Sequence, residues 1–219
     1  MAGDLVRKLH QRRWRDKLGL FFVEGEDAVE AATAEPLELV TDAKVLAEVS
    51  TAAHPPRVIG IYRREDLPRW EERPATLALW QLGDPGNVGT LIRTADAFGA
   101  AVALSPGCAD PTSPKALRAS AGSIWRVPLG QWDASNSLLL GRRVALVAHG
   151  GEPLSTLDLS ERVTFLLGAE RLGLPAEVER DVDASIPIAG AESLNVAAAG
   201  AIALYELSRR TTPSSPSRT

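Results

Sequence analysis

Short apolar segments recur from Ala75 onward, and a helix-like segment lies between each one and the next. Gly, Pro or Asp bounds these segments, as is typical of buried parallel strands. We expect strands at residues 76–82, 101–105, 144–148, 163–167 and 184–188. Because strands that alternate with helices form α/β folds, the pattern predicts an open parallel sheet with helices on both faces.

Residues 1–73 have a different pattern, and we expect them to form a separate small α/β domain. A basic helix precedes a strand at 20–23, and helices at 28–32 and 43–49 alternate with strands at 37–40 and 57–61. Charged residues and two prolines fill 63–74, which predicts a linker. The second domain then spans 74–210, and the polar tail at 211–219 is expected to be disordered.

Composition excludes several classes of protein. The chain is 45% hydrophobic and 24% charged, which is ordinary for a globular protein, and it has no apolar run long enough to span a membrane. Cys108 is the single cysteine, so an internal disulfide and a cysteine-rich metal site are excluded and a reducing cytoplasm is expected. The histidines, at positions 10, 54 and 149, lack metal-site spacing, and we expect no metal.

Charge is unevenly distributed along the chain. The formal net charge of −4 argues mildly against nucleic-acid binding, yet residues 7–17 carry six Lys or Arg and one Asp. A local basic stripe of this kind suits phosphate, and Trp14 within it is available for stacking on a base. A solvated helix face explains the same residues equally well.

The segment 84–100, DPGNVGTLIRTADAFGA, predicts a helix that Asn87 caps and Gly99 ends. One face of that helix is apolar and is expected to pack on the sheet, through Val88, Leu91, Ile92, Ala95 and Phe98. Arg93 projects from the opposite face, and Gly89, one turn earlier, is expected to leave open space beside it. The glycine spacing differs from that of a dinucleotide-binding loop and no Walker lysine is present, which disfavours a phosphate cradle and a nicotinamide dehydrogenase.

Two further segments carry polar side chains near expected strand ends. A short helix after Pro114 would present Lys115 and Arg118, which suit phosphates, although a capped surface helix explains them as simply. Gly168 and Glu170 follow the strand at 163–167, at the edge of the sheet where ligands of open α/β folds bind.

The last helix has two candidate caps, Ser193 and Asn195. Because one cap is enough, we expect one of these side chains to have another role. A stripe of small residues, Ala199, Gly200 and Ala203, permits close packing of this helix.

Together these segments resemble the SpoU/TrmH family of RNA ribose 2′-O-methyltransferases, in the SPOUT superfamily. Residues 87–99, with Asn-x-Gly-x-x-x-Arg and then Phe-Gly, are similar to the first family motif. Residues 168–174, with Gly-x-Glu-x-x-Gly-Leu, are similar to the second, and Ile-Pro at 186–187 with Ser-Leu-Asn-Val at 193–196 is similar to the third. The motifs stand in the family's order.

The resemblance implies a C-terminal trefoil knot, a homodimer, and S-adenosylmethionine as the cofactor. Residues 1–73 would be the RNA substrate-binding domain and 74–210 the SPOUT methyltransferase domain. The reaction would be methyl transfer to a ribose 2′-hydroxyl in tRNA or rRNA. A catalytically inert, RNA-binding member of the same family is the alternative.

The resemblance also implies site residues. The catalytic ones are Arg93, Asn87, Glu170, Ser193 and Asn195, and the cofactor-binding ones are Ala148, Gly168, Ile186, Ile188 and Leu194. The RNA-binding residues would be Arg7, Lys8, Arg12, Arg13, Lys115 and Arg118. The family arginine is often assigned as a general base. Because a guanidinium rarely gives up its proton, we expect Arg93 to stabilise the developing alkoxide and to grip the adjacent phosphate.

Overall fold

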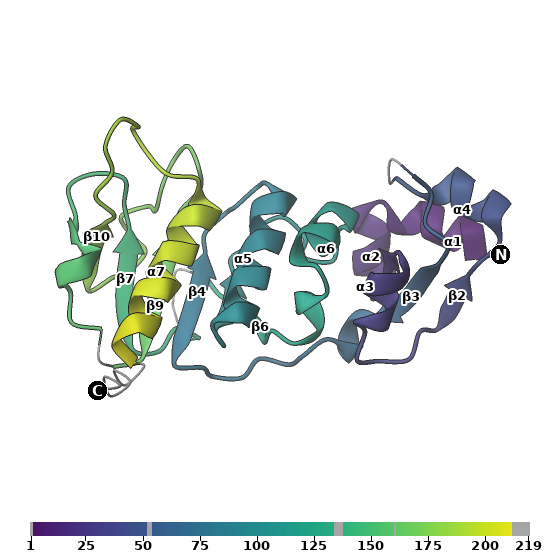
Figure 1. The fold of residues 1–219 in the computed structure, drawn as a ribbon, viewed down its shortest axis with the longest axis horizontal. Helices are drawn as coiled ribbons and strands as arrows, with labels where there is room; N and C mark the ends of the chain where they lie inside the picture. Colours follow the sequence, from purple (N-terminus) through teal and green to yellow (C-terminus); the bar gives the residue numbers. More distant parts are fainter. Residues whose placement is uncertain (1, 52–53, 134–137, 160, 212–219) are drawn as a thin grey trace, which may run out of the picture.

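The computed structural model describes residues 2–51, 54–133, 138–159 and 161–211. An antiparallel sheet of three strands comes from residues 20–63, and a parallel sheet of seven strands comes from residues 75–185. Figure 1 shows these two units at opposite ends of an elongated molecule. The tail predicted to be disordered lies outside the described residues, apart from Thr211. No helix in the described part of the chain is long and apolar enough to cross a membrane.

The first unit consists of α1 (Ala2–Leu9), α2 (Arg12–Leu18), β1 (Leu20–Glu24), α3 (Glu26–Glu30), β2 (Glu38–Val40), α4 (Ala43–Val49) and β3 (Ile59–Arg63), with the strand order β1-β3-β2. The helix predicted at 43–49 is confirmed, and Asp42 caps it by accepting hydrogen bonds from two backbone N–H groups. The basic helix is in fact two helices, because the backbone at Gln11 is extended.

The second unit consists of β4 (Ala75–Leu79), α5 (Pro85–Ala97), β5 (Ala101–Leu104), α6 (Pro114–Ser120), β6 (Leu129–Gln131), β7 (Arg142–Leu146), β8 (Glu152–Pro153), β9 (Val163–Leu167), β10 (Val182–Ser185) and α7 (Val196–Thr211). Short 3₁₀ helices are η1 (Arg64–Asp66), η2 (Ser123–Trp125) and η3 (Leu154–Thr156). All five predicted strands of this unit are present, most with shifted ends. The strands β6 and β8 were not predicted, because each is too short to show a periodicity.

The order of the large sheet is β6-β5-β4-β9-β7-β10-β8, and every neighbouring pair is parallel. The strand β9 therefore lies between β4 and β7, both of which precede it in the chain. Since parallel strands all end at the same edge, the loops that follow β4, β9, β7 and β10 leave the sheet side by side.

Helices cover one face of this sheet. Leu77 of β4 belongs to the large core that includes α5 and α7, which Figure 1 shows side by side in front of the strands. The next residue, Ala78, faces the other way together with Ala103, and Trp80 and Trp132 lie on that side with ring centroids 5.4 Å apart. The described side chains of this second layer come from strands and loops, so the prediction of helices on both faces is wrong for the described part of the chain. Large indoles packed on small alanines fill the layer instead.

The helix α5 packs more closely on its neighbours than the sequence predicted. A Cβ atom at Gly89 would lie 2.2 Å from the carbonyl oxygen of Ala116, so α6 fills the space that we expected to be open beside Arg93. Glycine is needed here because two backbones meet. The predicted apolar face is buried except for Phe98, which is 37% exposed at the end of the helix.

A buried ion-pair cluster joins the two units. Oδ2 of Asp110 accepts hydrogen bonds from Arg15 and Arg64, both at 2.7 Å, and its Oδ1 accepts two from Thr112. Burial by itself would raise the pKa of Asp110, but the Thr112 hydrogen bonds and the two arginine charges outweigh it, so this pKa lies below its usual value. Arg15 therefore belongs to the interior and not to the basic stripe predicted at 7–17.

Candidate active site

The loops that follow β7, β9 and β10 enclose a cavity of about 510 Å³ at the carboxyl edge of the parallel sheet. Its wall is formed mainly by residues 146–149, 167–174 and 192–194, together with the start of α7. Open α/β sheets bind their ligands at this edge. The topology thus gathers segments that are far apart in the sequence around one space.

All five residues predicted to bind the cofactor line this cavity: Ala148, Gly168, Ile186, Ile188 and Leu194. The strand β10 ends at Ser185, so Ile186 and Ile188 lie in the following loop and not in the strand that was predicted to reach 188. Residues from the second and third motifs therefore share one wall.

The cavity wall combines apolar and charged side chains, and the charged ones include Arg171 as well as two carboxylates. Leu146 and Leu167 contribute hydrocarbon surface, and Glu170 and Glu192 contribute carboxylates. Such a wall suits a ligand that has a flat apolar part and a cationic part.

The loop after β9 doubles back tightly beneath the cavity. Ala169 and Gly173 exchange backbone hydrogen bonds of 3.1 and 2.8 Å. A Cβ atom at Gly168 would lie 2.3 Å from the carbonyl carbon of Gly173, so glycine is required for this close approach. The tight turn holds Glu170 on the cavity wall and leaves Leu172, near its tip, 86% exposed.

Hydrogen bonds join three side chains that come from the three predicted motifs. Nδ2 of Asn87 donates to Oε1 of Glu170 at 2.7 Å, and Nδ2 of Asn195 donates to Oδ1 of Asn87 at 3.2 Å. Each asparagine side chain is used as donor and acceptor, since Oδ1 of Asn195 accepts from the backbone at the start of α7. The chain of hydrogen bonds fixes the direction in which Asn87 faces Glu170.

The prediction that Asn87 caps α5 is wrong. Asp84 is the N-cap: its Oδ1 accepts the backbone N–H of Asn87 at 2.9 Å, and Pro85 takes the first helical position. Nζ of Lys115 donates to the other oxygen of Asp84 at 2.6 Å, and this hydrogen bond lowers the pKa of Asp84. Because Asp84 does the capping, the side chain of Asn87 is available to Glu170.

The two candidate caps of α7 have separate roles. Asn195 caps the helix, and Ser193 lines the cavity. Of the predicted stripe of small residues, Gly200 and Ala203 are buried, and Gly200 lies against Leu91 of α5. This part of the stripe is therefore used for packing within the chain.

Arg93 stands apart from the cavity. It is exposed on α5 and is absent from the cavity wall, and it makes no hydrogen bond or ion pair with the residues that the structure describes. A single chain thus brings Asn87, Glu170, Ser193 and Asn195 to the cavity region and leaves the guanidinium of Arg93 uncommitted.

The basic residues predicted to bind RNA differ in their surroundings. Lys8 and Arg13 lie 5.4 and 5.8 Å from the ring centroid of Trp14, and Lys17, which was not assigned a role from the sequence, lies 5.2 Å from it. We call these four residues the Trp14 cluster. Its cations surround one aromatic ring, as in surfaces that bind single-stranded nucleic acid.

The other predicted RNA-binding residues contact carboxylates. Arg7 pairs with Asp4 and Glu48, and Arg12 lies 3.6 Å from Asp16. In α6, Lys115 pairs with Asp84, and Arg118 pairs with Glu24 at 2.8 Å. Apart from the pairs with Asp4 and Asp16, these pairs join residues that are distant in the sequence, so no local pattern indicates them.

Sequence reasoning also missed His149 and Glu192 on the cavity wall. The position of His149 directly after a predicted strand was the signal that could have identified it. Among the residues that the structure describes, no three His, Cys, Asp or Glu side chains are grouped so that they could hold a metal ion.

Comparison with known proteins identifies a family and several similar proteins. The SpoU rRNA Methylase family model matches residues 74–205. A 23S rRNA (guanosine(2553)-2′-O)-methyltransferase of Bacillus subtilis is 31% identical, covering 92% of this chain and 93% of that protein. An AdoMet-bound rRNA methyltransferase from Sinorhizobium meliloti is 30% identical with a TM-score of 0.86, covering 97% of this chain and 95% of that one. The SpoU methyltransferase AviRb from Streptomyces viridochromogenes, in complex with AdoMet, is 25% identical with a TM-score of 0.82, covering 95% and 97%.

Proposed function

The chain belongs to the SpoU rRNA methylase family, and we propose that it transfers a methyl group from S-adenosylmethionine to a ribose 2′-hydroxyl of structured RNA. The observation that carries this proposal is the hydrogen-bonded series Asn195–Asn87–Glu170, which unites three motifs beside one cavity. An inert family member has no such requirement for a polar series at the cavity. We propose rRNA as the first substrate to test and tRNA as the second.

The cavity fits S-adenosylmethionine in its chemistry. Leu167, Ile186 and Leu194 offer apolar surface for an adenine ring, and the carboxylates of Glu170 and Glu192 suit the cationic amino and sulfonium groups. Ala148 and Gly168 place main chain at the wall, where it can hydrogen-bond the base. When bound, this cofactor supplies a methyl group that its positive sulfur has already activated.

The protein's task is to position the ribose and to stabilise charge. As the 2′-hydroxyl gives up its proton to solvent, its oxygen becomes negative, and Arg93 stabilises that charge and grips the adjacent phosphate. The oxygen then bonds to the methyl carbon as the carbon–sulfur bond breaks and a neutral thioether leaves. Asn87 and Asn195 hold Glu170 in one orientation, and Glu170 and Ser193 contact the ribose. Alignment of the two reactants can contribute up to roughly 7–11 kcal/mol of the barrier reduction.

RNA capture is assigned to the first unit, residues 1–73, and methyl transfer to residues 74–210. The Trp14 cluster stacks on an unpaired base and attracts phosphates, and Arg7 and Arg12 add to its field. On α6, Lys115 and Arg118 extend the basic surface from the first unit toward the cavity.

We further propose a homodimer in which the second copy completes the site. Arg93 does not line the cavity of its own chain. The helices α5 and α7 pack on each other and expose Phe98, Ile202 and Tyr205, the last by 55%. Apolar side chains of this kind suit an interface between copies.

A trefoil knot and a cytoplasmic location complete the proposal. The knot is supported by β9, which inserts between β4 and β7 before the chain returns along α7 to α5. The location is supported by Cys108, a free and buried thiol, as suits a reducing compartment.

The test is a map of 2′-O-methyl groups in rRNA and tRNA from cells with and without the gene, with the Asn87→Ala variant as a complementing control. We expect one methylated ribose to disappear, and to return with the wild-type gene but not with the variant. An unchanged map in both RNA classes, together with no S-adenosylmethionine binding by calorimetry, would refute the proposal.

A further inference from the structure

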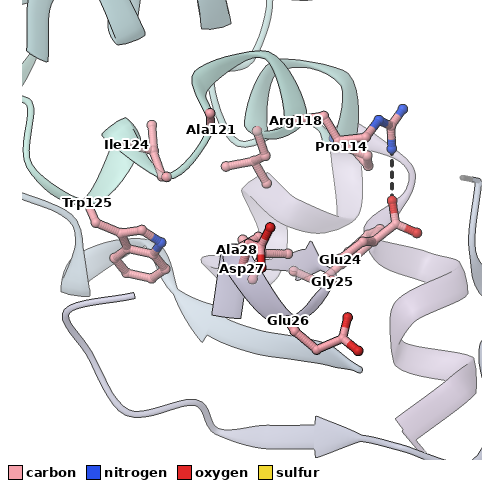
Figure 2. Close-up of a pocket in the computed structure, with 14 residues that line it drawn as sticks. Glu24, Gly25, Glu26, Asp27, Ala28, Pro114, Arg118, Ala121, Ile124 and Trp125 are labelled. Carbon is pink, nitrogen blue, oxygen red and sulfur yellow. Dashed lines mark hydrogen bonds and ion pairs between the residues drawn. The ribbon is translucent and has the colours of Figure 1, made fainter. Parts of the chain in front are cut away.

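A second cavity, of about 500 Å³, lies between the two units of the chain. Figure 2 shows it bounded by the turn from β1 into α3 on one side and by α6 and η2 on the other. It shares no lining residue with the cavity at the ends of β7, β9 and β10. The second cavity is therefore a separate feature of the interface between the units.

The inner wall of this cavity is apolar and contains an unused donor. Leu117, Ile124 and Trp125 come from the second unit and Ala28 from the first. The indole Nε1 of Trp125 is buried and has no hydrogen-bond partner among the described residues, although the ring is only 2% exposed. Figure 2 shows this nitrogen on the edge of the indole that faces Ala28. A buried N–H without an acceptor is costly, so its position in a cavity wall indicates a ligand that brings an acceptor.

Acceptors are available at the mouth of the cavity. Glu24 is fully engaged, because Ser50 and Thr51 donate to one oxygen and Arg118 to the other. Asp27, in contrast, is exposed and makes no side-chain hydrogen bond or ion pair with the described residues. Glu26 has only a 3.8 Å pair with Arg57, which is itself almost fully exposed. Asp27 is thus free to accept hydrogen bonds from a ligand, and Glu26 is held only by an exposed arginine.

We propose that this cavity binds an unpaired guanine of the substrate RNA, outside the nucleotide that is methylated. The inference rests on the proposed function, since it assumes an RNA substrate. Guanine has two neighbouring donors, N1–H and the 2-amino group, which match one carboxylate, and its O6 and N7 are acceptors that match the indole N–H. The apolar wall then covers the faces of the base.

The charges around the cavity favour RNA over other partners. The carboxylates at the mouth repel phosphate, so the RNA backbone stays outside, where Arg118 is 45% exposed at the rim and Lys115 follows Pro114 on the same helix. A cationic peptide would be attracted by Asp27 and repelled by the Trp14 cluster on the same unit. A nucleotide suits both regions, because its base can enter the acidic mouth of the cavity while its phosphates are attracted to the cations of the Trp14 cluster.

The test measures binding of the full-length protein to single-stranded pentanucleotides UUNUU, with N as guanine, inosine, adenine or cytosine. Inosine lacks only the 2-amino group. We expect guanine to bind about tenfold more tightly than inosine, as for the loss of one hydrogen bond to a charged acceptor. Asp27→Asn should abolish this preference. The matched control is Glu30→Gln, which removes the same charge from α3 outside the cavity.

The direction in which the RNA affinity changes in each variant separates base recognition from general electrostatics. Removal of an acidic charge should strengthen RNA binding if only phosphate repulsion changes, and Glu30→Gln measures that effect. The proposal is supported if Asp27→Asn binds the guanine pentanucleotide more weakly than the wild type does and Glu30→Gln binds it at least as tightly. Equal binding of all four RNAs, or guanine binding as tight in Asp27→Asn as in the wild type, overturns it. Calorimetry with S-adenosylmethionine and methyl transfer to rRNA, measured on the same samples, test the proposed function separately.

Discussion

Nδ2 of Asn195 donates a hydrogen bond to Oδ1 of Asn87 at 3.2 Å, although 108 residues separate the two side chains. The side chain of Asn87 also donates a hydrogen bond to Glu170. The Asn87 amide is thus bound by Asn195 and itself binds Glu170. The start of α7, the start of α5 and the loop after β9 are thereby fixed to one another beside the cavity.

Asn87→Asp should lower the rate of methyl transfer strongly, by about 100-fold, because the donor to Glu170 becomes a second carboxylate that repels it. S-adenosylmethionine binding, measured by calorimetry, should change far less. The double variant Asn87→Asp/Glu170→Gln restores a donor and an acceptor in reversed order, and we expect it to recover part of the lost rate. The exposed neighbour Thr90→Ala is the control. Wild-type activity in Asn87→Asp would show that the series has no role in catalysis.

Arg93→Ala should reduce kcat by about 10²–10³-fold, as for the loss of a donor to a developing oxyanion. Its thermal unfolding should be unchanged, because the side chain is exposed and has no partner in the described part of the chain. Arg93→Lys keeps the charge but cannot bind a phosphate through two parallel hydrogen bonds, so we expect an intermediate rate. A lysine variant as active as the wild type would contradict the bidentate grip.

Acid should weaken the joint between the two units. The pKa of Asp110 is lower in the folded chain than in the unfolded one, so its contribution to stability is complete above about pH 4 and is lost as the pH falls through the folded pKa. Asp110→Asn should lower the free energy of unfolding by about 3–5 kcal/mol at neutral pH, because Arg15 stays buried without its partner. Urea unfolding across this pH range checks both statements. If the free energy of unfolding of Asp110→Asn falls at low pH as steeply as that of the wild type, the pH dependence belongs to other groups.

Gly89→Ala should destabilise the fold by about 1–3 kcal/mol, since its Cβ would meet backbone of α6 that has no room to move. Gly83→Ala is the matched control, because a Cβ there meets nothing within 4 Å. We expect the control to be neutral or to stabilise by up to about 1 kcal/mol. Equal thermal midpoints for the two variants would mean that the contact between α5 and α6 is not tight in solution.

The parallel sheet could be predicted from the sequence because its buried strands are continuous apolar runs with clear ends. The strand 163–167 was predicted with its correct bounds, and the three motifs led to the cavity that Gly168, Ile186 and Leu194 line. Roles that depend on distant partners could not be predicted. Asn87 has the chemistry of a helix cap, and only the folded chain places Asp84 in that role and Glu170 within its reach.

The same limit applies to charge. Arg15 has the same residue type as its exposed neighbours in the basic stripe, and its burial depends on Asp110, 95 residues away. Strand patterns also could not show that no helix formed by the described residues packs on the second face of the sheet, because loop tryptophans cover that layer as well as a helix would.

The Asp110 cluster has a consequence for chimeric enzymes built from related methyltransferases. A C-terminal half joined to a foreign N-terminal half inherits a buried carboxylate without the two guanidinium groups that neutralise it. The exchangeable module is therefore not residues 1–73 alone but that segment together with a loop from the other half, residues 108–112. Graft boundaries drawn at the linker would cut through the joint that makes the two halves one protein.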